Sequence, residues 1–207
     1  FDIPPFTDEY LNGSIATNIR FTAFDDVDRR LEIQADITET ALQLSEFSWS
    51  KAAGVEGHAE IIIDFERDAI VDIPEFKIIA ADMEIHVKAS YVPKGDQLTK
   101  IEFDQLIFGR NNVKGAMILQ KNGGWDIGIQ GSSFDFSAYW DELFSSPLAD
   151  KDKKTLLDNV TIAIEVDKIW VSDTQSMEKV SGTFLYQDEI WRSFILSSYL
   201  NSGAIFD

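Results

Sequence analysis

Residues 82–92 read Asp-Met-Glu-Ile-His-Val-Lys-Ala-Ser-Tyr-Val, so that polar and apolar side chains alternate along the stretch. Successive side chains of a β-strand point to opposite faces of a sheet, and this alternation therefore predicts a strand with one apolar and one polar face. The same pattern occurs in residues 31–38, 57–67 and 159–168. Sheets with one apolar and one solvated face are commonly antiparallel. The sequence predicts a mostly β fold, with an antiparallel sheet that is curved or sandwich-like.

Turn-forming residues separate several of these strands. Pro93-Lys-Gly-Asp96, Gly109-Arg-Asn-Asn112 and Lys121-Asn-Gly-Gly124 are rich in the residue types that tight turns require. We therefore expect a meander of four strands, at 82–92, 98–108, 112–120 and 124–130. Three more strands are expected near the end of the chain, at 159–171, 178–187 and 189–200.

One amphipathic helix is expected at about 135–145. Its apolar residues recur at helical spacing, and Asp135 or Ser137 can cap its start while Pro147 helps to end it. Interfacial membrane helices usually carry a basic polar face, whereas this one offers Asp141 and Glu142. We therefore expect the helix to pack on the apolar face of the sheet, through Phe136, Tyr139, Trp140, Leu143 and Phe144.

A chain of 207 residues can form one large domain or two small ones. A charged connector follows the expected helix at 147–158, but the strands after it would make too small a core alone, so we expect a single domain over 1–207. The chain starts at Phe1 rather than Met and stops at Asp207 within strand-like sequence. We therefore expect it to be a fragment of a longer protein.

Composition excludes several classes of function. The formal charge of −18 repels phosphate backbones and acidic lipid surfaces, so nucleic-acid binding is not expected. The absence of cysteine excludes disulfides, zinc–thiolate sites and thiol nucleophiles. It is equally compatible with a bacterial cytoplasm and a periplasm.

Catalytic motifs are scarce. A Ser–His–Asp arrangement would need His58 or His86, which lie on the polar side of their strands, and Gly131-Ser-Ser133 is not a nucleophile elbow. Asp25, Asp26 and Asp28 lack the spacing of a calcium-binding loop, and we interpret them as residues of a hairpin turn. We expect no enzyme, no cofactor and no metal site.

Three phrases of the sequence resemble a known family. The first covers residues 31–57 and contains Phe47-Ser-Trp-Ser-Lys-Ala-Ala-Gly54; the second is Leu106-Ile-Phe-Gly-Arg110 with Val113-Lys-Gly115. The third is Gly124-Trp-Asp-Ile127 with Gly131-Ser-Ser-Phe-Asp135. In this order they resemble the central periplasmic domain, of unknown function, of AsmA-like proteins related to YhdP in Gram-negative bacteria. The 147–158 connector has no counterpart in that pattern.

The resemblance implies a role in the bacterial cell envelope. Such proteins are anchored in the inner membrane, extend through the periplasm on long β-sheets with an apolar lining, and are implicated in phospholipid transport and outer-membrane biogenesis. It implies no catalytic residues. The expected partners are phospholipid or fatty acyl chains and the rest of the parent protein.

The resemblance and the alternation together give a first hypothesis, in which acyl chains contact an apolar face made of two strands. The expected lipid-facing residues are Ile61, Ile63, Phe65, Met83, Ile85 and Val87. The alternatives are a structural or protein-interaction β domain with a closed core and no ligand, and a sugar-active enzyme on a β-sandwich. Alternation is the same in an open trough and in a closed sandwich, so it leaves these hypotheses open.

Overall fold

The computed structural model describes residues 10–44, 49–92, 97–121, 123–137, 159–187 and 190–199. Most of these residues lie in β-strands, so the predicted mostly β fold is confirmed. The chain divides into two compact units, Phe1–Gly109 (unit 1) and Arg110–Asp207 (unit 2).

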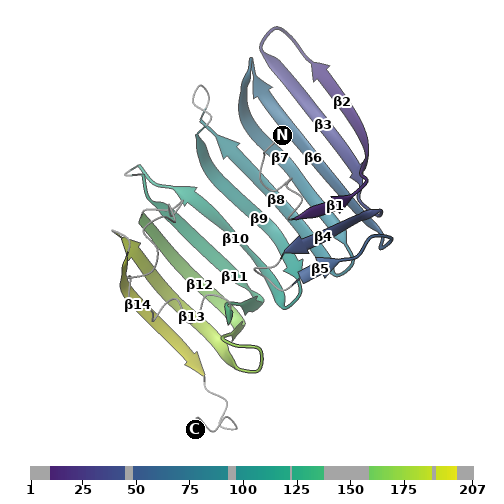
Figure 1. The fold of residues 1–207 in the computed structure, drawn as a ribbon. Helices are drawn as coiled ribbons and strands as arrows, with labels where there is room; N and C mark the ends of the chain where they lie inside the picture. The colour runs from purple at the N-terminus through teal and green to yellow at the C-terminus, as the bar shows by residue number, and fades with distance from the viewer. Residues whose placement is uncertain are drawn as a thin grey trace. The chain divides into compact units, whose positions relative to one another are not determined.

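The larger sheet of unit 1 is antiparallel throughout, and Figure 1 shows its strand order. Predicted strands 31–38, 57–67, 82–92 and 98–108 are all present, as β3, β6, β8 and β9. In spatial order the strands are β2 (Ala16–Ala23), β3 (Asp28–Asp36), β6 (Gly57–Glu66), β7 (Ala69–Ala80), β8 (Met83–Tyr91) and β9 (Leu98–Phe108).

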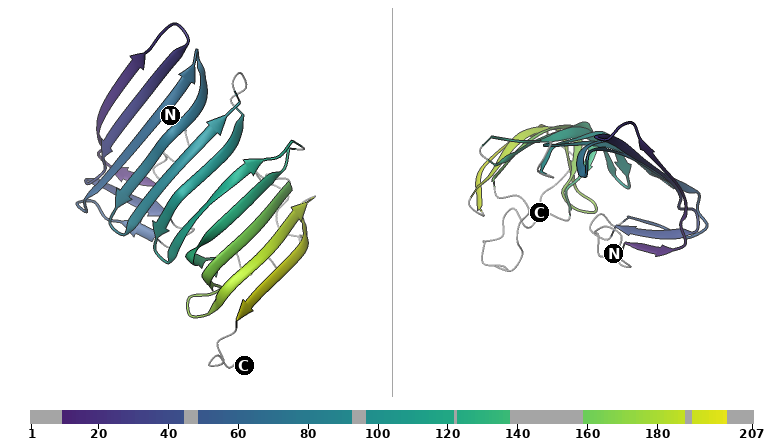
Figure 2. Two further views of the ribbon diagram at one scale, coloured as in Figure 1. Left: turned by 180° about the vertical axis from the view of Figure 1, so that it is seen from behind. Right: turned by 90° about the horizontal axis from the view of Figure 1, so that it is seen from above.

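A small second sheet in unit 1 comprises β1 (Leu11–Gly13), β4 (Thr40–Leu44) and β5 (Trp49–Lys51), in the order β1-β4-β5. Trp49 of this sheet forms a buried cluster with Met83 and Phe108 of the larger sheet. Met83 begins β8 and Phe108 ends β9, so the small sheet covers one end of the larger sheet, as Figure 2 also shows. A closed hydrophobic core therefore exists at this end of unit 1.

Unit 2 contains β10 (Asn111–Leu119), β11 (Trp125–Asp135), β12 (Asn159–Trp170), β13 (Ser176–Gln187) and β14 (Ile190–Tyr199). These strands match the five predicted after residue 110. The expectation of antiparallel pairing was wrong at one place, because β11 and β12 are parallel. Parallel neighbours cannot be joined by a tight hairpin and need a long crossover connection. Residues 136–158 supply that connection, which alternation within the strands does not reveal.

The helix expected at 135–145 starts differently from the prediction. Asp135 is the last residue of β11, and Ser137 is the one helical residue in the described part of the chain. The backbone N–H of Ser137 donates a hydrogen bond of 3.0 Å to Asp135 Oδ1, so Asp135 caps this turn as expected. Residues 138–158, including Tyr139, Trp140, Asp141, Glu142, Leu143, Phe144 and the 147–158 connector, lie outside the described residues, as does the turn at 93–96.

Candidate functional site

A row of apolar side chains crosses one face of the larger sheet of unit 1 from edge to edge. Residues paired across strands share a face, and one such row crosses all six strands. We call this surface the apolar face. Its central row is Ile19, Ile33, Ile61, Phe76, Val87 and Phe103. Flanking rows add Phe21, Leu31 and Ile63 on one side, and Ala35, Ala59, Ile78, Ile85 and Leu106 on the other.

All six expected lipid-facing residues belong to this face, but they come from strands that are not neighbours. Ile61, Ile63 and Phe65 lie on β6, whereas Met83, Ile85 and Val87 lie on β8, and β7 separates the two strands. The face was expected to be built from two strands, whereas β7 lies between them and also contributes to it. Phe76 and Ile78 of β7, which were not among the expected residues, complete the face between these two strands.

Strand β7 was not predicted, because the alternation of its polar and apolar residues is interrupted. Its pairing with β8 shifts register between Ile73 and Phe76, around Pro74, so apolar residues change phase within the strand. The regular run Phe76, Ile78, Ala80, opposed by Lys77, was the available sign of a strand.

The apolar face is closed at one end. Met83 is only 3% exposed because it packs against Trp49 and Phe108, and Ile85 packs against the same cluster. Met83 is therefore a core residue rather than an accessible lipid contact. Ile61, Ile63, Phe65 and Val87 are half-buried, and none of them belongs to that cluster.

The apolar face is open at its β2 edge. Ile19 is 61% exposed and Phe21 is 60% exposed. Within the described residues, β3 is the one sheet neighbour of β2. Two large apolar side chains on the same face thus lie in solvent beside the half-buried Leu31 and Ile33.

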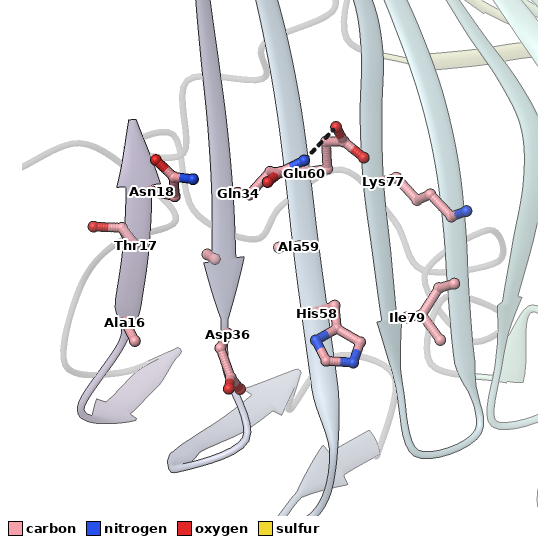
Figure 3. A pocket seen from close by; sticks show the side chains of 11 residues that line it. Ala16, Thr17, Asn18, Gln34, Asp36, His58, Ala59, Glu60, Lys77 and Ile79 are labelled. Carbon is pink, nitrogen blue, oxygen red and sulfur yellow. Dashed lines mark hydrogen bonds between the residues drawn. The ribbon is translucent and has the colours of Figure 1, made fainter. Parts of the chain in front are cut away.

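The opposite, polar face holds a shallow hollow of about 630 Å³ over β2, β3, β6 and β7. Figure 3 shows that its side chains come in cross-strand rows, with Asp36, His58 and Ile79 in one and Gln34, Glu60 and Lys77 in the next. The amide of Gln34 donates to Glu60 at 3.3 Å. His58 lies 3.3 Å from the exposed carboxylate of Glu56, and no serine lines the hollow. The hollow therefore offers polar contacts but not the paired serine and histidine of a serine hydrolase.

The serine considered as a nucleophile has structural contacts. Ser133 Oγ donates to the backbone oxygen of Arg110 at 2.6 Å and accepts from Trp170 Nε1 at 3.1 Å. Its hydroxyl is thereby held between two strands of unit 2. These contacts give Ser133 a role in packing rather than an activating base.

The Asp25 region forms the hairpin turn that its sequence predicted. Asp25 Oδ1 accepts the backbone N–H groups of Asp28 and Val27, each at 2.7 Å. These two hydrogen bonds lower the pKa of Asp25 below its ordinary value, with the bond from Asp28 the larger cause. Within the described ranges, no group of three His, Cys, Asp or Glu side chains is placed to hold a metal ion.

The first phrase of the family resemblance forms a corner of unit 1. Lys51 is 2% exposed, and its ammonium donates to the carbonyl oxygens of Ile37 and Thr40 at 2.8 Å and of Thr38 at 3.1 Å. Trp49 Nε1 donates to Asp82 at 2.7 Å. These bonds hold the small sheet to the larger one.

Arg110 of the second phrase and Asp135 of the third phrase meet in a corner of unit 2. Arg110 pairs with Asp135 at 2.8 Å and lies 4.8 Å from the ring centre of Trp170. Asn111, which is buried, accepts the backbone N–H of Asp135 at 2.8 Å. These corner residues of the three phrases make structural contacts, whereas Leu31, Ile33 and Leu106 of the same phrases lie on the apolar face.

The described residues include no helix long and apolar enough to cross a membrane. Comparisons of the chain with protein-family models, curated proteins and solved structures gave no match.

Proposed function

We propose that the apolar face of unit 1 binds acyl chains, as part of a non-catalytic segment of a bacterial envelope protein that transports lipid. The observation that supports this most directly is the uninterrupted apolar row across six strands, which ends at Ile19 in solvent, with Phe21 of the flanking row exposed beside it. Large exposed apolar surfaces in folded proteins generally mark sites of interaction.

The dimensions suit an acyl chain. A ten-residue strand such as β6 spans about 33 Å, comparable with the hydrocarbon thickness of a bilayer. Burial of an alkyl chain contributes about 0.8 kcal/mol per methylene, so partial contact gives useful affinity that remains reversible. Reversibility is required of a conduit, because a site that retains its lipid stops transport.

The proposed setting is periplasmic, in a protein anchored in the inner membrane, and it rests on the resemblance to AsmA-like proteins. Binding of acyl chains does not depend on that setting. It requires only that the apolar face stays accessible to lipid, while the acidic side chains lie on the other face of the sheet.

The proposal is tested with Ile63→Asn, matched against Ile62→Asn. These neighbours lie on opposite faces of β6, because Ile63 pairs with Leu31 and Ile62 pairs with Glu32. Ile63 is preferable to Ile85, whose contact with the buried cluster would confound binding with folding. Binding of a fluorescent fatty acid should weaken at least about tenfold in Ile63→Asn, since a polar amide replaces apolar contact, and should change little in Ile62→Asn.

Circular dichroism of both variants separates binding from folding. Retained strand content with lost binding supports an open face. Unfolding of Ile63→Asn, or equal binding by both variants, contradicts the proposal. Native mass spectrometry of the purified chain provides a second readout, in which co-purified lipid is expected.

The second candidate function is a structural or interaction domain with a closed core. The cluster of Trp49, Met83 and Phe108 favours it, because at that end the small sheet already covers the apolar face. The two candidates differ in the region of Ile19, Phe21 and Ile63, which this cluster does not include.

A further inference from the structure

One cation lies on the apolar face. Arg29 pairs with Phe65 on one side and with Ala23 on the other, in phase with Leu31 and Ile33. The register places every other charged residue in the described strands β2, β3 and β6 on the polar face. The charged residues of β7, β8 and β9 likewise share rows or hydrogen bonds on that polar face.

Arg29 lies at the end of the face that is remote from the small sheet. It is the second residue of β3, whereas the last residue of β3, Asp36, leads into the corner that Lys51 holds. Ala35 is six positions after Arg29, which corresponds to about 20 Å along the strand. An extended acyl chain fits along this length, over Phe65, Ile63 and Ile61.

Among the described residues, the guanidinium of Arg29 pairs with one carboxylate, and this ion pair is weak. Arg29 Nη1 lies 3.1 Å from Asp68 Oδ1, and the Asp68 side chain is 95% exposed. Ion pairs this exposed contribute little to stability. A guanidinium carries five N–H donors in a planar fork that matches carboxylate and phosphate oxygens. The other arginine of the same strand end, Arg30, instead makes two hydrogen bonds to Asp64 on the polar face, at 2.6 and 2.8 Å.

We infer that Arg29 binds the anionic head of an amphiphile whose alkyl tail lies on the apolar face and points towards the small sheet. The inference rests on the proposed function and adds to it the class of ligand and its orientation. With a formal charge of −18, the chain as a whole repels anions. A preference for an anionic head over a neutral one therefore requires a local cation, and within the described strands of this face that cation is Arg29.

The test uses four ligands with the same tail: dodecanoate, dodecyl phosphate, dodecanol and dodecyltrimethylammonium. Affinities are measured by competition with a fluorescent fatty acid, for the unaltered chain, Arg29→Gln and Arg20→Gln. Arg20 is the matched control, because it lies on the polar face of the same hairpin, opposite Glu32 at 3.3 Å. Both substitutions remove one positive charge from the same hairpin.

Arg29→Gln should weaken binding of the anion that fits the site about tenfold, as expected for loss of a charge-assisted hydrogen bond, and leave dodecanol unchanged. Arg20→Gln should change none of the ligands by more than about twofold. If Arg29→Gln lowers the affinity for dodecanoate alone, the head is a fatty-acid carboxylate. If it lowers the affinity for dodecyl phosphate alone, or lowers it more than that for dodecanoate, the head is a phospholipid phosphate.

Two results would overturn the inference and leave the proposed function standing. In the first, Arg29→Gln lowers the affinity for all four ligands equally. In the second, Arg29→Gln and Arg20→Gln change the affinity for the anions equally. In both cases dodecanol still binds. Failure of every ligand to bind the unaltered chain instead rejects the proposed function.

Discussion

Lys51 holds its ammonium group among backbone carbonyls rather than beside a carboxylate. Four carbonyl oxygens, of Ile37, Thr38, Thr40 and Ala52, lie within 3.3 Å of its Nζ. Burial of a charge is costly unless hydrogen bonds replace its hydration. The carbonyls supply that replacement, and in return the lysine satisfies backbone groups where the chain turns from one sheet to the other.

Lys51→Met should therefore destabilise unit 1 by about 3 kcal/mol, because several buried carbonyls lose their donor together. Urea unfolding followed by circular dichroism measures this cost. Lys114→Met, at an exposed position of β10, is the control and should cost less than about 0.5 kcal/mol. A cost below about 1 kcal/mol for Lys51→Met would show that water replaces the ammonium.

The alternation in the sequence already places Lys51 and Arg29 at positions where apolar residues are expected. Lys51 is two residues from Trp49, and Arg29 is two residues from Leu31, so each shares a face with its apolar neighbour. The pattern marks these residues as exceptions. It does not distinguish the buried carbonyl cage around Lys51 from the half-exposed position of Arg29, because the surrounding strands come from distant parts of the chain.

Among the strands of unit 2, β11 approaches the backbone of β10 closely at Gly131. A Cβ atom on Gly131 would lie 2.2 Å from the backbone oxygen of Asn112 and 2.8 Å from the Cα of Val113. This contact falls at the register shift between Asn112 and Val113. The glycine is therefore required by the close backbone approach at a bulge.

Gly131→Ala should destabilise unit 2 by about 2 kcal/mol or more, because backbone atoms must move to admit the methyl group. Gly128→Ala is the matched control in the same strand. An added Cβ there meets nothing within 4 Å, so its effect should stay within about 0.5 kcal/mol. Urea unfolding of both variants gives the comparison, and equal stabilities would contradict the geometry at Gly131.

At the scale of the whole molecule, the excess of acidic residues opposes the folded state. The formal charge is −18, and the isoelectric point is about 4.3. Compact states of such chains are destabilised by self-repulsion, which salt screens. In the larger sheet of unit 1 the carboxylates gather on the polar face, which places like charges close together.

Added sodium chloride should therefore raise the thermal unfolding midpoint at pH 7 by a few degrees between about 0.02 and 0.5 M. Near pH 4.3 the net charge approaches zero, and the same salt increase should have little effect. Thermal scans at both pH values measure the difference. An equal rise at the two pH values would point to a general salt effect rather than to charge repulsion.

Alternation is a local property of the chain, so the strands and their two-faced character could be predicted from the sequence alone. No knowledge of neighbouring strands was needed to predict strands 57–67, 82–92 and 159–171 or the Asp25 turn. Tertiary structure decided which strands adjoin: β7 lies between β6 and β8, and β11 pairs in parallel with β12. It also decided that Met83 is closed core while Ile19 and Phe21 are exposed. Exposure depends on what covers a face, and the small sheet that covers one end comes from residues far away along the chain.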